Sequence, residues 1–134
     1  MKQTLILIRG IPGAGKSTLA KEFQKIYPNM CHFEADQYFV TPSGSYAYDK
    51  NKIKEAHDWC KNNTKQAIQS GQSVVVSNTF IKLWELEFYL KLATQQEINY
   101  IVIKAEGNYK NIHDVPEHII KRMQDNFQEL PDTN

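Results

Sequence analysis

The chain has 134 residues, 41% of them hydrophobic, and its 16 basic and 15 acidic side chains leave a formal net charge of +1. This length suits one domain rather than two, and the near balance of charge gives no reason to expect a strongly basic surface for long nucleic acids. The two cysteines, Cys31 and Cys60, cannot form a disulfide framework. The apolar run that begins at Leu5 stops at Arg9, far short of a signal sequence or a membrane span. We therefore expect one domain over residues 1–134, in a cytoplasmic setting and without a membrane partner.

Strand-like and helix-like segments alternate along the first part of the chain. Residues 4–8 are apolar or β-branched, which is typical of a strand buried on both faces. Residues 17–27 carry apolar side chains at helical spacing and are followed by Pro28, which ends a helix. A short strand at 31–35 then leads into the turn-rich residues 41–45. The predicted order is therefore strand, helix, strand and surface loop.

The alternation continues through the middle of the chain. Asp49 is predicted to cap a long helix that Gly71 ends. Strands at 73–77 and 98–105 flank a further helix over 83–93. The inner stripe of the long helix is predicted to consist of Ile53, Ala56, Cys60, Thr64, Ala67 and Ile68.

A last helix is predicted after Asp114 and Glu117, which have the spacing of a capping box; its apolar positions are Ile119, Met123, Phe127 and Leu130. Parallel strands need crossover helices, so the fold class is α/β, with three layers and a parallel sheet of about four strands flanked by helices. The carboxyl ends of such strands share one rim. The residues expected at that rim are Gly10, Asp36, Ser77, Asn78 and the segment after Ala105.

One segment matches a phosphate-binding motif letter for letter. Residues 10–17 read GIPGAGKS, which fits GxxxxGK[ST], with the strand before it and the helix after it that the motif requires. The glycines let backbone N–H groups surround phosphates, Lys16 would neutralise the β- and γ-phosphates of ATP, and Ser17 would bind Mg²⁺. This predicts a P-loop NTPase fold with ATP and Mg²⁺ as cofactors. The predicted nucleotide-binding residues are Gly10, Ile11, Pro12, Gly13, Ala14, Gly15, Lys16, Ser17 and Thr18.

The remaining loops separate the classes of P-loop protein. Residues 51–54 read NKIK and lack the final aspartate of a guanine-reading segment, so a GTPase is not expected. Asn78 stands where a motor ATPase carries an acidic Mg²⁺ ligand. Asp36, predicted at the end of the second strand, could accept a proton from an attacking hydroxyl. These features favour a kinase-type fold and phosphoryl transfer.

The motifs of the chain resemble those of the P-loop 5′-polynucleotide kinases of T-even-like phages and their bacterial and animal relatives. The resemblance covers nearly the whole chain and rests on residues 10–17, 35–39, 56–60, 77–80 and 108–116. It implies that Lys16 and Ser17 bind donor phosphate and Mg²⁺ and that Asp36 is the general base for a 5′-hydroxyl. It also implies that the segment around Lys110 is a catalytic lid over the donor phosphates. The expected activity is ATP-dependent phosphorylation of a 5′-hydroxyl end of DNA or RNA.

Three positions depart from the phage enzyme. Phe39 replaces an arginine for the 3′-phosphate of the acceptor, Asn78 replaces an aspartate, and Lys110 replaces a lid arginine. A lysine keeps the positive charge but not the bidentate contact to phosphate oxygens. Two alternatives therefore stay open: a kinase for a nucleoside or another small metabolite, and an ATP-binding module that hydrolyses ATP or catalyses nothing.

Several side chains fit two roles. Asn78 and Thr79 could hydrogen-bond the acceptor or a Mg²⁺-bound water, or could cap the next helix. Arg122 is a second cationic candidate that suits a helix surface better. His57 and Cys60 share a helical face, but two ligands make a poor zinc site, so packing is expected there. A stacking platform for an unpaired acceptor base and ordinary packing are both open for Tyr38, Phe39, Tyr46, Tyr48 and Trp59.

Overall fold

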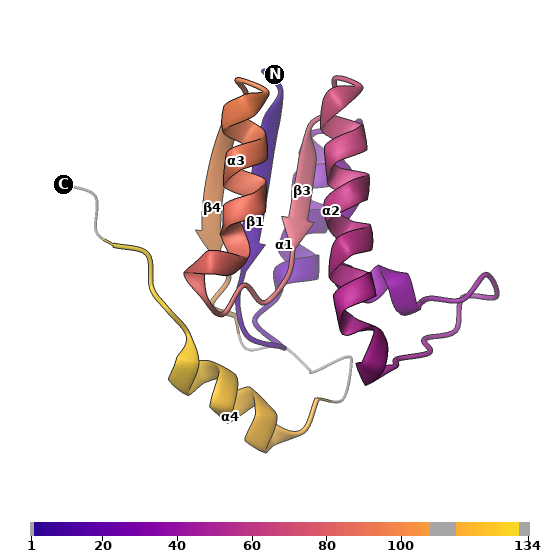
Figure 1. Cartoon of the computed structure of the whole chain (residues 1–134), viewed down its shortest axis with the longest axis vertical. Coiled ribbons are helices and arrows are strands. Elements are labelled where there is room, and N and C mark those ends of the chain that lie inside the picture. Colours follow the sequence, from indigo (N-terminus) through magenta and orange to yellow (C-terminus); the bar gives the residue numbers. More distant parts are fainter. Residues whose placement is uncertain (1, 108–114, 132–134) are drawn as a thin grey trace.

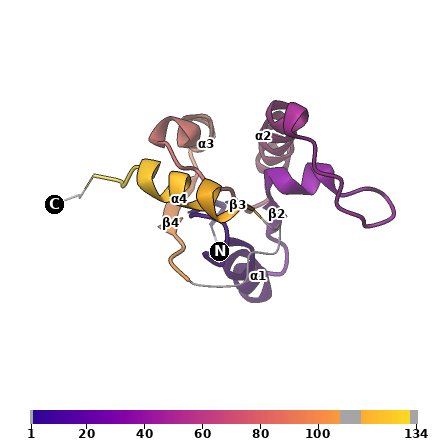
Figure 2. The ribbon, with the colours of Figure 1, turned by 90° about the horizontal axis from the view of Figure 1, so that it is seen from below.

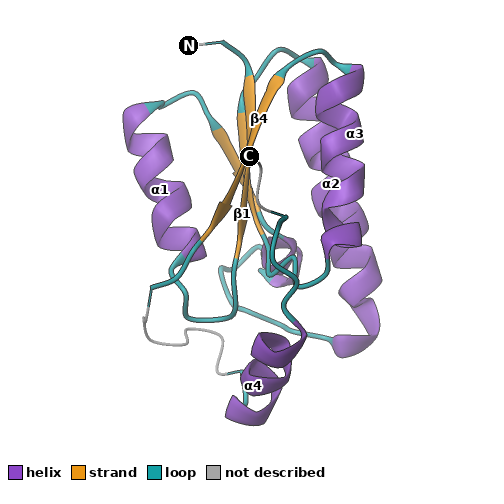
Figure 3. Cartoon of the chain, turned by 90° about the vertical axis from the view of Figure 1, so that its left-hand side faces the viewer, coloured by secondary structure: helices purple, strands orange, loops and turns teal. Residues whose placement is uncertain are grey.

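A parallel four-stranded sheet lies at the centre of the computed structural model, which describes residues 2–107 and 115–131. In the order β2-β3-β1-β4, the strands are β2 (Cys31–Phe33), β3 (Val74–Ser77), β1 (Thr4–Arg9) and β4 (Asn99–Lys104). All three neighbouring pairs are parallel. The α-helices are α1 (Lys16–Ile26), α2 (Ile53–Gln69), α3 (Glu87–Gln95) and α4 (Glu117–Asn126). Helix α1 covers one face of the sheet and α2 and α3 cover the other (Figure 1, Figure 3), so the predicted three-layer α/β fold is confirmed.

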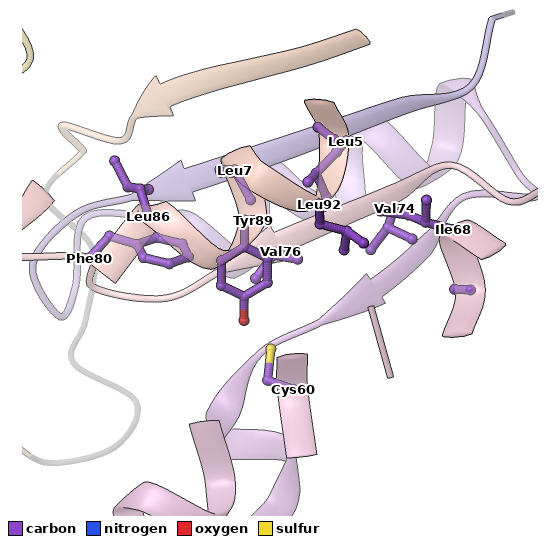
Figure 4. Close-up of a cluster of buried hydrophobic side chains, with 12 residues drawn as sticks. Leu5, Leu7, Cys60, Ile68, Val74, Val76, Phe80, Leu86, Tyr89 and Leu92 are labelled. Carbon is purple, nitrogen blue, oxygen red and sulfur yellow. The ribbon is translucent and has the colours of Figure 1, made fainter. Parts of the chain in front are cut away.

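The two faces of the sheet bury two separate cores, which explains the uninterrupted apolar sequence of β1. Leu5 and Leu7 pack with the side chains of α2 and α3 (Figure 4). Ile6 and Ile8 point to the opposite face and pack with Ala20 of α1. Within the described ranges, 2–107 and 115–131, no helix is long and apolar enough to cross a bilayer.

Several boundaries differ from the sequence prediction. Strand β2 ends at Phe33, and Ala35–Phe39 form a 3₁₀ helix, η1, instead of continuing the strand. Two more 3₁₀ helices, η2 (Lys50–Lys52) and η3 (Leu83–Leu86), precede α2 and α3. Asp49 caps η2 rather than α2, because its carboxylate accepts a backbone N–H from that turn at 2.9 Å.

Two predicted helix faces also need correction. Ile53 is the first residue of α2 and is 41% exposed. The rest of the predicted stripe is buried: Ala56, Cys60, Thr64, Ala67 and Ile68. Helix α4 ends at Asn126, so Phe127 and Leu130 lie beyond it, and α4 buries none of its residues. Asp114 of the predicted capping box lies outside the described residues.

Arg9 joins the C-terminal segment to the end of the sheet. Its guanidinium is buried, donates from Nε and Nη2 to Phe80 O at 3.1 and 2.7 Å, and lies 4.2 Å from the centre of the Phe127 ring. Burial lowers the pKa of Arg9, and the Glu129 and Glu85 carboxylates act in the opposite direction. Since a buried arginine needs partners, these contacts hold the loop after β3 and the chain after α4 in one place.

Candidate functional site

The carboxyl ends of the strands bring distant segments together at one rim of the sheet. Gly10 N donates to Thr79 O at 3.1 Å, and Ala105 N donates to Arg9 O at 2.8 Å. Gly10 has no room for a side chain, because a Cβ there would lie 2.9 Å from Ala105 O. Figure 2 views the molecule from this end, with α4 in front of the sheet. The predicted convergence at this rim is therefore confirmed for the loops after β1, β3 and β4.

The P-loop joins β1 to α1 at this rim. Gly13 and Gly15 have φ values of 85° and 91°, in the left-handed region that favours glycine. Ala14 is buried, and its backbone N–H donates to Ile11 O at 3.1 Å. Helix α1 begins at Lys16, so the N–H groups of its first turn, which have no partners within a helix, adjoin the loop. The loop therefore has the local structure of an anion-binding turn.

Lys16 is held inside this loop. Its Nζ donates to Ile11 O at 3.0 Å. Burial lowers the pKa of Lys16 to about 8, although the Glu34 and Asp36 carboxylates act in the opposite direction. An ammonium that has lost much of its hydration gains more from a bound anion than a surface lysine does. The lysine is thus suited to a phosphate ligand.

Glu34 is a site residue that the sequence prediction missed. Its Oε2 accepts hydrogen bonds from Ser17 Oγ at 2.8 Å and from Ser77 Oγ at 2.9 Å. His32 Nε2 lies 2.7 Å from Ser77 Oγ, and burial lowers the pKa of His32. A carboxylate therefore stands beside the P-loop serine. The available signal was a charged residue near the carboxyl end of the predicted second strand.

Asn78 supports the chain beside Glu34, and the next helix, η3, is capped at Lys82 and not at Asn78 as predicted. The side chain is buried, and its Oδ1 accepts from Ala35 N at 2.8 Å. Its Nδ2 donates to Cys60 Sγ at 3.7 Å. The carboxamide is thus bound within the protein, where it fixes the start of η1 to the end of β3.

Asp36 lies in η1 and not at the end of β2 as predicted. Its Oδ1 accepts a hydrogen bond from Tyr46 Oη at 3.1 Å. The turn that carries it is anchored, because Phe39 packs against Ala56 of α2. Glu34 directly precedes η1 and Asp36 lies within it, so two carboxylates, two residues apart, stand at the start of this supported turn.

Comparison with known proteins identifies the family. A family model described as an AAA domain matches residues 5–130. The chain belongs to this family. Human NEDD4-binding protein 2 is 31% identical over 92% of the chain, and the chain spans 8% of that protein's length. The match therefore covers one small part of the human protein and says nothing about the function of the rest of it.

Solved structures resemble this AAA domain in fold. A chain of the Pnkp1/Rnl/Hen1 complex matches with a TM-score of 0.64 and 19% identity, over 90% of this chain and 39% of that chain. APS kinase CysC of Mycobacterium tuberculosis matches with a TM-score of 0.62 and 11% identity, over 93% of this chain and 96% of that chain. The AAA domain therefore has a kinase-type P-loop fold.

The remaining candidates include one residue that the structure does not describe. Lys110 lies outside the described residues, and Arg122 is exposed on α4. Burial lowers the pKa of His57, and Cys60 is buried with its sulfur directed at the Tyr89 hydroxyl (Figure 4). Among residues 2–107 and 115–131, no group of three or more His, Cys, Asp or Glu side chains could hold a metal ion. Cys60 packs in the core between the sheet, α2 and α3, and His57 is half-buried on the same helix.

Proposed function

We propose that this AAA domain transfers the γ-phosphate of ATP, with Mg²⁺, to a 5′-hydroxyl end of DNA or RNA. The observation that carries the proposal is the position of Asp36, two residues from a carboxylate that hydrogen-bonds the P-loop serine Ser17. A base for an acceptor hydroxyl and a site for donor phosphates thus share one rim. The likeness in fold to a chain of an RNA repair complex supports a nucleic-acid acceptor.

The donor phosphates would bind in the P-loop. The turn at Gly13 and Gly15 and the first turn of α1 supply N–H groups for the phosphate oxygens. The Lys16 ammonium would exchange Ile11 O for oxygens of the β- and γ-phosphates. Thr18, exposed in the first turn of α1, would lie at the edge of the same site.

Ser17 and Glu34 have the chemistry of a magnesium site. Mg²⁺ prefers oxygen ligands and takes only one or two of them from a protein, with water and phosphate supplying the rest. A hydroxyl and a carboxylate oxygen 2.8 Å apart offer such a pair, and the Ser77 hydroxyl holds the carboxylate in place. When bound, the ion would offset negative charge on the β- and γ-phosphates.

Asp36 would act on the acceptor. Its carboxylate would take the proton of the 5′-hydroxyl while the hydroxyl oxygen bonds to the γ-phosphorus and ADP leaves with the electrons of the broken bond. Burial and the neighbouring Asp36 carboxylate raise the pKa of Tyr46. The Tyr46 hydroxyl therefore stays protonated and orients the Asp36 carboxylate through its hydrogen bond.

A small metabolite is the second candidate acceptor. The observation that favours it is the likeness in fold to APS kinase, which covers 96% of that chain. Both candidates use the same donor site, so only the acceptor distinguishes them.

The proposal is tested by transfer of labelled γ-phosphate from ATP, with Mg²⁺, to a panel of 5′-hydroxyl DNA and RNA oligonucleotides, free nucleosides and adenosine phosphosulfate. Label on the oligonucleotide ends is the expected result. Label confined to the small molecules would replace the proposal with the second candidate. ATP binding without any transfer would reduce the protein to a nucleotide-binding module.

The Glu34→Gln variant is expected to need about 10–100 times more Mg²⁺ for half-maximal activity, because the amide is a much weaker ligand than the carboxylate. The amide can still accept the serine hydrogen bonds, so the local structure should persist. A magnesium titration of the initial rate measures the effect, with Glu22→Gln on the exposed face of α1 as the control. An unchanged magnesium requirement would remove Glu34 from the metal site.

The affinity for ATP is expected to fall as the pH rises above 8. Lys16 has a pKa of about 8 without nucleotide, and contact with phosphate oxygens would raise that pKa. Below pH 8 the lysine is already charged, whereas above pH 8 binding must first protonate it, which weakens affinity by up to about tenfold per pH unit.

Calorimetric titration at pH 9, in two buffers with different ionisation enthalpies, should detect uptake of a proton upon ATP binding. The Lys16→Arg variant keeps its charge at that pH and should show no uptake. Equal heats in both buffers for the unmodified protein would contradict the assignment of Lys16 as the titrating phosphate ligand.

A further inference from the structure

A loop beside the candidate site, residues 40–48, has an ordered backbone and is called the tyrosine loop below. Val40 and Tyr46 form an antiparallel bridge, and Ala47 N donates to Phe39 O at 2.8 Å. Gly44 turns the chain with a φ of 87°. Figure 1 shows the loop extending sideways near the start of α2, at the end of the molecule to which the strands point. These backbone hydrogen bonds determine the path of the tyrosine loop.

The loop exposes two tyrosine rings on a buried support. Tyr46 and Tyr48 are 42% and 54% exposed, and their ring planes differ by 17° with centres 6.4 Å apart. The buried Phe39 ring meets both of them edge to face, at 6.2 and 5.3 Å between centres. Two nearly parallel and partly exposed rings are therefore supported edge to face by a buried phenylalanine, an arrangement that suits stacking with a further ring.

The same loop is bonded to the candidate base. Tyr46 Oη donates to Asp36 Oδ1 at 3.1 Å. A group stacked on the Tyr46 ring would therefore be separated from the Asp36 carboxylate by little more than the tyrosine hydroxyl and its hydrogen bond. In a nucleoside, the base and the 5′-hydroxyl are likewise separated by the sugar alone.

Three lysines follow the tyrosines in η2 and the first turn of α2. Lys50, Lys52 and Lys54 are all exposed. The acids nearest in sequence have other partners, since Asp49 caps η2 and Glu55 accepts from a tyrosine hydroxyl at 2.8 Å. None of the three lysines forms an ion pair with a carboxylate of residues 2–107 or 115–131. The lysines thus remain available to a mobile anion.

We propose that the tyrosine loop and these lysines bind the single-stranded 5′ end of a nucleic acid, with unpaired bases on Tyr46 and Tyr48 and the following phosphates on Lys50, Lys52 and Lys54. This inference rests on the proposed 5′-hydroxyl kinase function and names what selects its acceptor. Aromatic side chains followed by basic ones are the chemistry that single strands need, because every base has a stacking face and every linkage a negative charge. A small metabolite would leave the lysines without a ligand.

Binding is measured apart from catalysis, by fluorescence anisotropy of labelled single strands of about ten nucleotides without ATP. Neutralisation of three phosphates predicts a slope of about −2 for log K against log salt concentration. DNA and RNA strands are compared with strands that lack the base at the second position from the 5′ end, the position that the proposal assigns to Tyr48.

Two sets of variants test the tyrosines and the lysines separately. Tyr48→Leu should weaken binding by about 5- to 150-fold, the range for loss of one stacked base, and should not weaken binding of the strand that lacks its second base. Changing Lys50, Lys52 and Lys54 together to glutamine should flatten the salt slope toward zero. The matched control changes Lys2, Lys65 and Lys91, which are exposed elsewhere on the molecule.

The outcomes separate this inference from the proposed function. Weaker binding by both sets, with the control unchanged, supports the tyrosine loop as the acceptor site. Oligonucleotide binding that neither set weakens would overturn the inference and leave the kinase proposal standing. Absence of strand binding by the unmodified protein would also overturn it, and transfer to nucleosides alone would then replace the proposed function. Strand binding lost in both sets, without any transfer by the unmodified protein, would uphold the binding surface and reject the kinase proposal.

Discussion

The Asp36→Asn variant is expected to lose about 10²–10⁴-fold in kcat for phosphate transfer while its Kd for ATP stays nearly unchanged. Asparagine has the same shape and can still accept the hydrogen bond of Tyr46 Oη, 3.1 Å away in the unmodified protein. The substitution removes the negative charge and the capacity to take up a proton but keeps the hydrogen-bond acceptor. The change therefore isolates the role of a base from the role of a structural acceptor.

Single-turnover transfer and calorimetric ATP binding are the two measurements needed. Asp58→Asn, at an exposed position on α2, is the matched control and should match the unmodified protein in both. Transfer at the unmodified rate in the Asp36→Asn protein would exclude Asp36 as the base. A parallel loss of ATP affinity would instead mean that the substitution disturbs the donor site.

The Lys16→Met variant is expected to lower kcat/KM by about 10²–10³-fold, the typical effect of removing one group that stabilises charge in the transition state. Unlike the change at Asp36, it should also weaken ATP binding. Methionine keeps most of the length of the side chain and suits the buried position, so the P-loop itself should keep its structure.

The Lys65→Met variant, on an exposed part of α2, is the control for loss of one positive charge. Thermal unfolding without nucleotide should give a similar Tm for all three proteins, whereas addition of ATP should raise the Tm least in the Lys16→Met protein. An ATP-dependent rise equal to that of the unmodified protein would show that Lys16 is not a phosphate ligand.

The sequence was sufficient for the sheet and the P-loop, because both are local patterns. The run from Leu5 to Ile8 can only be a strand buried on both faces when Gly10 and a helix follow it. The glycines at 13 and 15 adopt the left-handed φ values that their motif requires.

The position of Glu34 beside Ser17 and the structural contacts of Asn78 could not be predicted from local patterns. Both depend on hydrogen bonds between residues 43 positions apart in the sequence, and hydrophobic periodicity does not predict such contacts. The sequence prediction also placed Glu34 inside a strand, over residues 31–35. A carboxylate within a strand normally faces water at the edge of the sheet, so Glu34 was not predicted to be a site residue. The 3₁₀ turn that replaces the end of that strand brings the carboxylate to Ser17.

The exposure of Tyr46 and Tyr48 also could not be predicted from the sequence. Aromatic side chains are buried more often than not, so their spacing alone left packing and stacking equally open. The structure shows that Phe39 is buried and that the two tyrosines which pack on it are partly exposed, which is the basis of the stacking proposal.

The turn that carries Glu34 and Asp36 has a consequence for the order in which substrates bind. One residue, Ala35, separates the two carboxylates, and its N–H is fixed to Asn78. A magnesium–nucleotide complex that immobilises Glu34 would immobilise Asp36 with it, so the acceptor would lose less conformational entropy when it arrives second. Steady-state kinetics should then be ordered, with nucleotide first, and the KM for the acceptor should fall as nucleotide approaches saturation.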